Sequence, residues 1–196
     1  VSLDGLKTLW INTGTLCNLT CANCYIESSP RNDRLSYITI DEMRSYLDEI
    51  RDQGLETEEI AFTGGEPFMN PDMMQMLEVT LSRGFRALVL TNAMKPMRHH
   101  ESPLKKLKYW FNEKLEIRVS VDHYTQQLHE KERGPGNWQP MLDGLIWLSQ
   151  NKFNFDIAGR TPWGEDEAEM RQGYAKLFAE HDIAVDADDP AKLVLF

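Results

Sequence analysis

Short β-rich runs alternate with longer amphipathic segments along this chain. The short runs predict strands at residues 8–13, 59–63, 85–91, 115–121 and 153–158, and the opening of a sixth strand at 192–196. In the first amphipathic segment, apolar residues recur at helical spacing: Ile40, Met43, Tyr46, Leu47 and Ile50. This alternation predicts βαβ units and a parallel sheet. The expected fold class is therefore α/β, in a single domain over residues 1–196.

Local signals predict where the helices start and end. Thr39 and Glu42 form a capping box at the start of the first helix. Asn70 and Pro71 are predicted to be the N-cap and the first residue of a second helix, which ends at Gly84. Further helices are predicted to begin at residue 102 and to span about 139–151 and 165–181. Each predicted helix therefore connects two predicted strands.

Chemically distinctive residues directly follow the predicted strands. Three cysteines come after the first strand, residues 64–67 after the second, Asn92 after the third and residues 120–122 at the end of the fourth. Right-handed crossovers bring the carboxyl ends of parallel strands to one edge of the sheet. We therefore expect these residues to share one site.

The composition is typical of a soluble globular protein. Hydrophobic residues make up 41% of the chain and charged residues 27%, and no apolar run is long enough to span a membrane. The first five residues have neither the basic nor the apolar stretch of a signal peptide. We therefore predict a cytoplasmic protein without a membrane partner. The formal net charge of −10 repels phosphate backbones, so nucleic acid is not expected as a partner.

The chain has three cysteines, Cys17, Cys21 and Cys24, and all lie within one short segment. An odd number of cysteines cannot pair off into disulfides, and this clustering points to metal or redox chemistry. Three thiolates on one loop can hold three irons of a cubane cluster and leave the fourth iron without a protein ligand. The alternatives are a zinc site completed by a remote histidine and three unrelated buried thiols.

The CxxxCxxC spacing after the first strand, together with GGEP at residues 64–67 after the second, resembles the radical S-adenosylmethionine (SAM) superfamily. The resemblance covers nearly the whole chain and implies a partial, TIM-like (β/α)6 barrel. It also implies that the three cysteines bind a [4Fe–4S] cluster, whose open iron is chelated by the amino and carboxylate groups of SAM. One electron from the reduced cluster would cleave SAM to a 5′-deoxyadenosyl radical, which abstracts hydrogen from a substrate.

The resemblance assigns the GGEP residues, Gly64, Gly65, Glu66 and Pro67, to the amino group of SAM. Two glycines at a strand end independently allow the backbone to approach a ligand closely, and an acidic neighbour suits an ammonium group. Taken alone, this short motif is more often an ordinary turn, and it becomes specific only together with the three cysteines.

Polar residues at the later strand ends complete the predicted site. Ser120 and Asp122 point to the same side of their strand and resemble the segment that contacts the ribose or carboxylate of SAM. A strand-end cap is the alternative for this pair. Arg133 and Arg160 are each a candidate partner of the SAM carboxylate. Asn92 is a candidate contact to SAM or substrate, with a turn-forming role as its alternative.

The sequence departs from the family pattern at one position. The family often has an aromatic residue just before the third cysteine, where this chain has Asn23. Tyr25 follows that cysteine and is expected to supply the surface for the adenine instead.

The substrate and the extent of the protein are not defined by these residues. A peptide and a small molecule both stay open as substrates, and a flavodoxin or ferredoxin is the expected kind of electron donor. The alternative function is a SAM- or cluster-binding module without radical chemistry, used as a scaffold or for electron transfer. Because residues 192–196 open a sixth strand where the sequence stops, we expect a barrel truncated at its C-terminal end, from a longer protein.

Overall fold

The computed structural model describes residues 5–196, which form a six-stranded parallel sheet with its strands in sequence order. The strands are β1 (Thr8–Asn12), β2 (Glu59–Thr63), β3 (Arg86–Thr91), β4 (Leu115–Ser120), β5 (Asn154–Gly159) and β6 (Leu193–Leu195). Within the described residues β1 does not pair with β6, so the sheet is not closed. The predicted α/β class and partial barrel are confirmed. The prediction about a signal peptide concerns residues 1–4, which lie outside the described residues.

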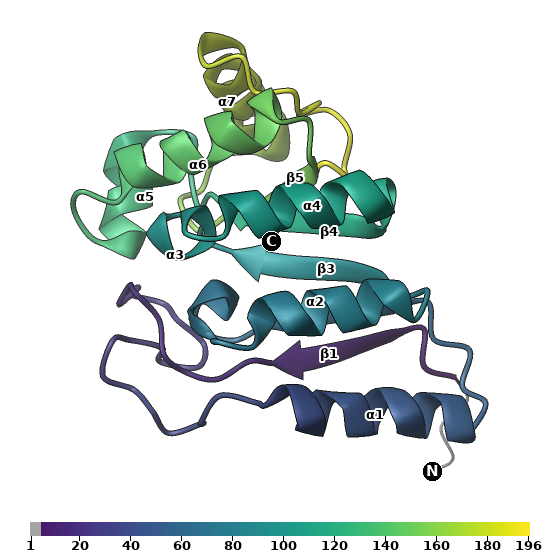
Figure 1. The fold of residues 1–196 in the computed structure, drawn as a ribbon. Coiled ribbons are helices and arrows are strands. Elements are labelled where there is room, and N and C mark those ends of the chain that lie inside the picture. The colour runs from purple at the N-terminus through teal and green to yellow at the C-terminus, as the bar shows by residue number, and fades with distance from the viewer. Residues whose placement is uncertain (1–4) are drawn as a thin grey trace.

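The helices connect successive strands and cover one face of the sheet. They are α1 (Ile40–Asp52), η1 (Pro67–Met69), α2 (Met73–Ser82), α3 (Lys95–Arg98), α4 (Glu101–Phe111), η2 (Asn112–Lys114), α5 (Gln126–Arg133), α6 (Trp138–Gln150) and α7 (Glu167–Glu180). Figure 1 shows α1, α2 and α4 running alongside the strands, with the long loop between β1 and α1 at the end to which the strand arrows point. No helix within residues 5–196 combines the length and the apolar character that crossing a membrane requires.

Most predicted boundaries agree with the structure, but two helix starts are wrong. The capping box at the start of α1 is confirmed. However, α2 begins at Met73 rather than at Pro71, and α4 begins one residue earlier than predicted. The N-cap of α2 is Asp72, whose N–H donates to the side-chain oxygen of Asn70 at 2.9 Å. The side-chain amide of Asn70 donates to the carbonyl oxygens of Thr13 and Ile38, at 3.2 and 2.9 Å, and so ties the turn before α2 to both ends of the loop between β1 and α1.

The sequence did not predict α3 or α5. The segment that forms α3 is only four residues long. The sequence of α5, QQLHEKER, has no apolar stripe, and its buried residues are His129 and Glu132. Since hydrophobic periodicity is the main sequence signal for a helix, a helix that buries polar side chains escapes it.

The two faces of the sheet differ in polarity. The face toward the helices is apolar and contributes to the core with Ile60, Phe62, Val89, Ile117 and Ile157. The inner face of the open barrel is mixed and carries apolar residues such as Leu88 as well as charged ones. Arg86 contacts Glu59 and Glu116 at 3.5 and 3.1 Å, and Arg118 pairs with Asp156 at 2.6 Å. The inner face therefore already carries paired charges before the strand ends are reached.

Candidate active site

A cavity of about 480 Å³ opens at the C-terminal ends of the strands. Most of the predicted site residues line it: Cys17, Cys21, Cys24, Tyr25, Gly64, Gly65, Asn92, Ser120, Asp122, Arg133 and Arg160. Glu66 and Pro67 are not part of the lining and are buried next to it. The volume is ordinary for a site that holds a small molecule or cofactor. The fold thus brings residues from the ends of several strands into one cavity.

The loop after β1 presents the three cysteines to this cavity. The backbone N–H of Leu19 donates to Sγ of Cys17 at 3.4 Å, and that of Ser28 donates to Sγ of Cys24 at 3.3 Å. Burial raises the pKa of the Cys17 thiol to about 12 and also raises the pKa of Cys21. Metal coordination deprotonates a thiol regardless, and N–H donors to sulfur tune iron–sulfur clusters. These contacts suit cysteines that serve as cluster ligands.

The groups in the cavity fit an iron–sulfur cluster that leaves one iron open. The lining contains three thiols, no histidine and one carboxylate, that of Asp122, which two arginines already pair. Within residues 5–196, no three His, Cys, Asp or Glu side chains come close enough together to hold a single metal ion. A cubane cluster has a different requirement, because each thiolate binds a different iron.

The two glycines after β2 pack directly against the cysteine loop. The N–H of Gly65 donates to the carbonyl of Gly14 at 2.8 Å, and that of Glu66 donates to the carbonyl of Leu16 at 3.1 Å. A Cβ added at Gly65 would lie 2.6 Å from the carbonyl carbon of Leu16, and Gly64 has a φ of +133°. The glycines therefore allow the end of β2 to dock against the segment that leads into the first cysteine.

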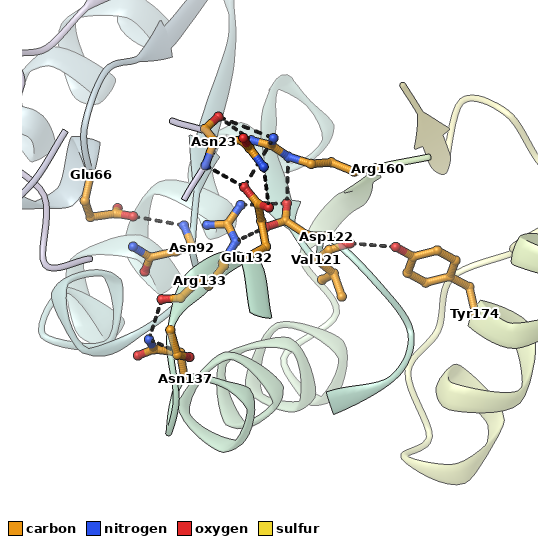
Figure 2. Close-up of polar contacts among 11 residues, drawn as sticks. Asn23, Glu66, Asn92, Val121, Asp122, Glu132, Arg133, Asn137, Arg160 and Tyr174 are labelled. Atoms are coloured by element: carbon orange, nitrogen blue, oxygen red, sulfur yellow. Dashed lines mark hydrogen bonds and ion pairs between the residues drawn. The ribbon is translucent and has the colours of Figure 1, made fainter. Parts of the chain in front are cut away.

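The carboxylate of Glu66 is directed toward the end of β3, as Figure 2 shows for its contact with Asn92. Its oxygens accept hydrogen bonds from the Thr91 hydroxyl at 2.8 Å and from the N–H groups of Asn92 at 2.9 Å and Phe68 at 3.2 Å. Burial raises the pKa of Glu66 to about 7, although these donors act to lower it. In the structure this carboxylate holds the end of β3 and does not line the cavity. The sequence had led us to expect it beside a bound ammonium group instead. A contact between SAM and the backbone of this motif stays a prediction.

Replacing Glu66 with glutamine should lower the free energy of unfolding by about 1–3 kcal/mol. A glutamine amide cannot accept all three hydrogen bonds, so a buried donor is left without a partner. Chemical denaturation of the purified chain measures the change. The matched control is Glu56→Gln in the exposed loop before β2, where a change within about 0.5 kcal/mol is expected. Equal stability of the two variants would show that the Glu66 hydrogen bonds contribute nothing net.

Asp122, just beyond the end of β4, pairs with two guanidinium groups (Figure 2). Arg133 from α5 contacts both carboxylate oxygens, at 2.7 and 3.0 Å. Burial acts to raise the pKa of Asp122, but the charge and hydrogen bonds of Arg133 together with the charge of Arg160 outweigh it, so the pKa lies below its usual value. Arg160, beyond β5, is held less tightly: its Nε lies 3.3 Å from Asp122 and is buried without a hydrogen-bond partner among the described residues. Of the two arginines, Arg160 therefore has the longer and weaker contacts.

Two histidines lie behind this cluster and outside the cavity lining. His123 contacts Glu165 and Thr125 through its two ring nitrogens, at 2.7 and 2.8 Å. His129 in α5 is fully buried, neither ring nitrogen has a hydrogen-bond partner among the described residues, and its ring meets the edge of Trp138. Burial, with a smaller contribution from the charge of Arg133, lowers the pKa of His129 to about 4.

The buried neutral His129 should make stability fall as the pH is lowered from about 6.5 toward 4. An unfolded histidine has a pKa near 6.5, so in this window the unfolded chain binds a proton that the folded chain does not. The free energy of unfolding has its full value above pH 6.5, and roughly 3 kcal/mol of it is lost by the time pH 4 is reached. The His129→Leu variant should show a correspondingly shallower decline in denaturation experiments across this range. The exposed His99→Leu serves as the control and should keep the wild-type slope.

The sequence interpretation missed two aromatic residues that line the cavity. Trp10 in β1 is 50% exposed and Phe196 is 63% exposed. Trp10 lies between Leu9 and Ile11, and only Ile11 is buried in the core. The alternation along β1 was therefore a usable signal that Trp10 faces the inside of the barrel.

The structure is an open parallel barrel with three thiols in the cavity at the C-terminal ends of its strands. This arrangement is typical of α/β enzymes that bind a cofactor at that edge of the sheet. Residues 11–169 match the family model described as the Radical SAM superfamily. The chain therefore belongs to the radical SAM superfamily, whose members are enzymes that bind a [4Fe–4S] cluster and SAM.

Characterised relatives resemble parts of the chain. The antilisterial bacteriocin subtilosin biosynthesis protein AlbA of Bacillus subtilis is 33% identical over 118 residues, which is 60% of this chain and 25% of AlbA. An AdoMet-dependent heme synthase of Methanosarcina barkeri is 28% identical over 144 residues, or 72% of this chain and 38% of the synthase. The chain thus matches well under half the length of these relatives.

Solved structures share the fold. Streptococcus suis SuiB bound to S-adenosylmethionine has a TM-score of 0.71 at 17% identity, covering 92% of this chain and 40% of SuiB. The enzyme anSMEcpe with bound AdoMet has a TM-score of 0.63 at 17% identity, covering 91% of this chain and 48% of that protein. At these identities the likeness shows the fold alone.

Proposed function

We propose that the chain is the core of a radical SAM enzyme that holds a [4Fe–4S] cluster through its three cysteines and cleaves SAM reductively. The observation that carries the proposal is that all three thiols open onto the same cavity as the cluster of Asp122, Arg133 and Arg160. When bound, the cluster supplies the electron that splits SAM into methionine and a 5′-deoxyadenosyl radical, which abstracts hydrogen from the substrate.

The residues of the chain would bind and orient SAM in this cavity. Arg160 can turn toward the carboxylate because its contacts to Asp122, Asn23 and Glu132 are all 3.3 Å or longer, whereas Asp122 holds Arg133 through two shorter hydrogen bonds. The hydroxyl of Ser120 and the free lone pairs of Asp122 can hydrogen-bond the ribose hydroxyls. Gly64 and its neighbour carry no side chain that would keep the amino group away from the backbone carbonyls. The exposed ring of Tyr25 offers a flat surface for the adenine.

The proposed activity does not name the substrate from which the radical abstracts hydrogen. The relatives include a bacteriocin biosynthesis protein and heme synthases, so both a peptide and a small molecule stay open as the substrate. The alternative, a cluster-binding scaffold or electron carrier, is disfavoured by the cavity. A carrier has no need for a space of about 480 Å³ lined by charged groups beside its cluster.

Anaerobic incubation with SAM and dithionite tests the proposal, with dithionite in place of the predicted flavodoxin or ferredoxin. The reconstituted chain should release 5′-deoxyadenosine, measured by chromatography, whereas Cys21→Ala should release none. A fully reconstituted sample that binds SAM and forms no 5′-deoxyadenosine would instead favour the non-catalytic module.

The assignment of Arg160 has its own test on the same sample. Calorimetric titration should show that Arg160→Ala raises the Kd of SAM about 10-fold or more, because a charge-assisted contact is lost. Arg44→Ala removes an exposed guanidinium on α1 that pairs with Asp41, and should leave the affinity unchanged. An unaltered Kd in Arg160→Ala would remove this residue from the proposed SAM site.

A further inference from the structure

The segment between the second and third cysteines is held by a single residue of α5, Glu132. The backbone carbonyl of Glu132 accepts from the N–H of Ala22 at 2.8 Å. Its side-chain oxygens accept from the backbone N–H and from the side-chain amide of Asn23, both at 2.9 Å (Figure 2). All three hydrogen bonds join parts of the chain that are more than one hundred residues apart in sequence.

The Glu132 carboxylate is buried, and Arg160 balances its charge. Glu132 is 5% exposed, and Nη1 of Arg160 lies 3.5 Å from its Oε1. The same guanidinium lies 3.4 Å from the backbone carbonyl oxygen of Asn23. A buried carboxylate that is fully hydrogen-bonded and paired holds its partners in one geometry, because moving them would leave charge unsatisfied.

The segment between the cysteines has little else to define its position. It is neither helix nor strand, and Asn23 itself is exposed. Asn23 also stands where the family pattern often has an aromatic residue, and its side-chain amide supplies the donor to the second oxygen of Glu132. The amide at this position and the carboxylate on α5 therefore act as a matched pair.

We propose that Glu132 is a positioning residue for Cys21 and Cys24, which acts through Asn23 to hold the two thiols at the spacing that the cluster requires. This goes beyond the proposed function, on which it rests, because it gives a role to two residues that do not line the cavity. A residue that does not bind the metal itself can fix the orientation of a residue that does. Loss of such a positioning residue typically weakens metal binding 10-fold to 100-fold.

The test measures how fast the reconstituted chain loses iron to a ferrous chelator under anaerobic conditions. Asn23→Ala and Glu132→Ala should each lose iron about 10-fold faster than wild type, with an altered electron paramagnetic resonance spectrum of the reduced cluster. The control is Glu130→Gln on the same helix, whose carboxylate accepts from the N–H groups of Gly136 and Trp138 and does not contact the cysteine loop. It should match wild type.

A polarity swap separates positioning from a general effect on folding. In the double variant Asn23→Asp/Glu132→Gln the direction of the side-chain hydrogen bond is reversed, so iron retention should return toward wild type. The single change Asn23→Asp sets two carboxylates against each other and should lose iron fastest. Since Asn23 is exposed, its variants test the pair even if Glu132→Ala fails to fold.

The outcomes distinguish the two proposals. If the wild-type chain takes up no cluster, the proposed function fails. If wild type loads a cluster and both alanine variants lose iron no faster than Glu130→Gln, only the role of Glu132 is overturned. The same conclusion follows if the swapped pair behaves like Asn23→Asp alone.

Discussion

Replacing Cys17, Cys21 or Cys24 with alanine should leave the reconstituted chain with little or no bound iron and sulfide. Each change removes one of three protein ligands, and the chain has no other cysteine to take its place. The cluster binding free energy is linked to the ordering of the loop, so the loss should also lower the melting temperature of the reconstituted protein. Iron and sulfide assays on anaerobic samples measure the first effect.

The matched control for the cysteine variants is Ser29→Ala in the same loop, whose side chain does not line the cavity. It should retain wild-type iron and sulfide. Circular dichroism of the apo proteins should show unchanged helix content in all four variants, which separates ligand loss from unfolding. Full retention of iron and sulfide in the three cysteine variants would refute the assignment of these thiols as ligands.

The substitution Gly65→Ala should damage both the stability of the chain and its cysteine loop, although it adds only one methyl group. The new Cβ would lie 2.6 Å from the carbonyl carbon of Leu16 and 3.0 Å from the carbonyl oxygen of Thr15. These are backbone atoms, so the cysteine loop itself must move. We expect the free energy of unfolding to fall by about 1–3 kcal/mol, and the reconstituted protein to bind less iron.

Gly5→Ala is the control for this substitution, because a Cβ at Gly5 meets no atom within 4 Å. It should change neither stability nor iron content. Denaturant titration of the apo chain and iron analysis of the reconstituted chain separate the two effects. If Gly65→Ala kept both at the control level, the close packing of the glycines against the cysteine loop would not be needed for the site.

The strand order and the cysteine loop were predictable because their signals are local. Alternating β-rich runs and amphipathic segments fix the α/β class, and CxxxCxxC with GGEP fixes where the cluster ligands and the glycine turn lie along the chain. The capping box of Thr39 and Glu42 was equally readable, since its two residues lie within one helical turn. These features depend on neighbours a few residues away, which the sequence shows directly.

Polar contacts between distant residues were decided only by the tertiary structure. The sequence placed Glu66 near a ligand, whereas the structure buries its carboxylate against Thr91 and Asn92. It offered Arg133 and Arg160 as equals, whereas Asp122 occupies the first with two short hydrogen bonds and leaves the second loosely held.

The helix α5, with Glu132 on it, shows the same limit most clearly. Its buried face is polar, so no hydrophobic period marks it, and its partner Asn23 lies on the first loop of the barrel. A side-chain hydrogen bond depends on the relative position of two backbones, which no short motif contains. The sequence by itself therefore determined the fold class and the positions of the three cysteines along the chain. The folding of the barrel decided which polar groups lie next to them.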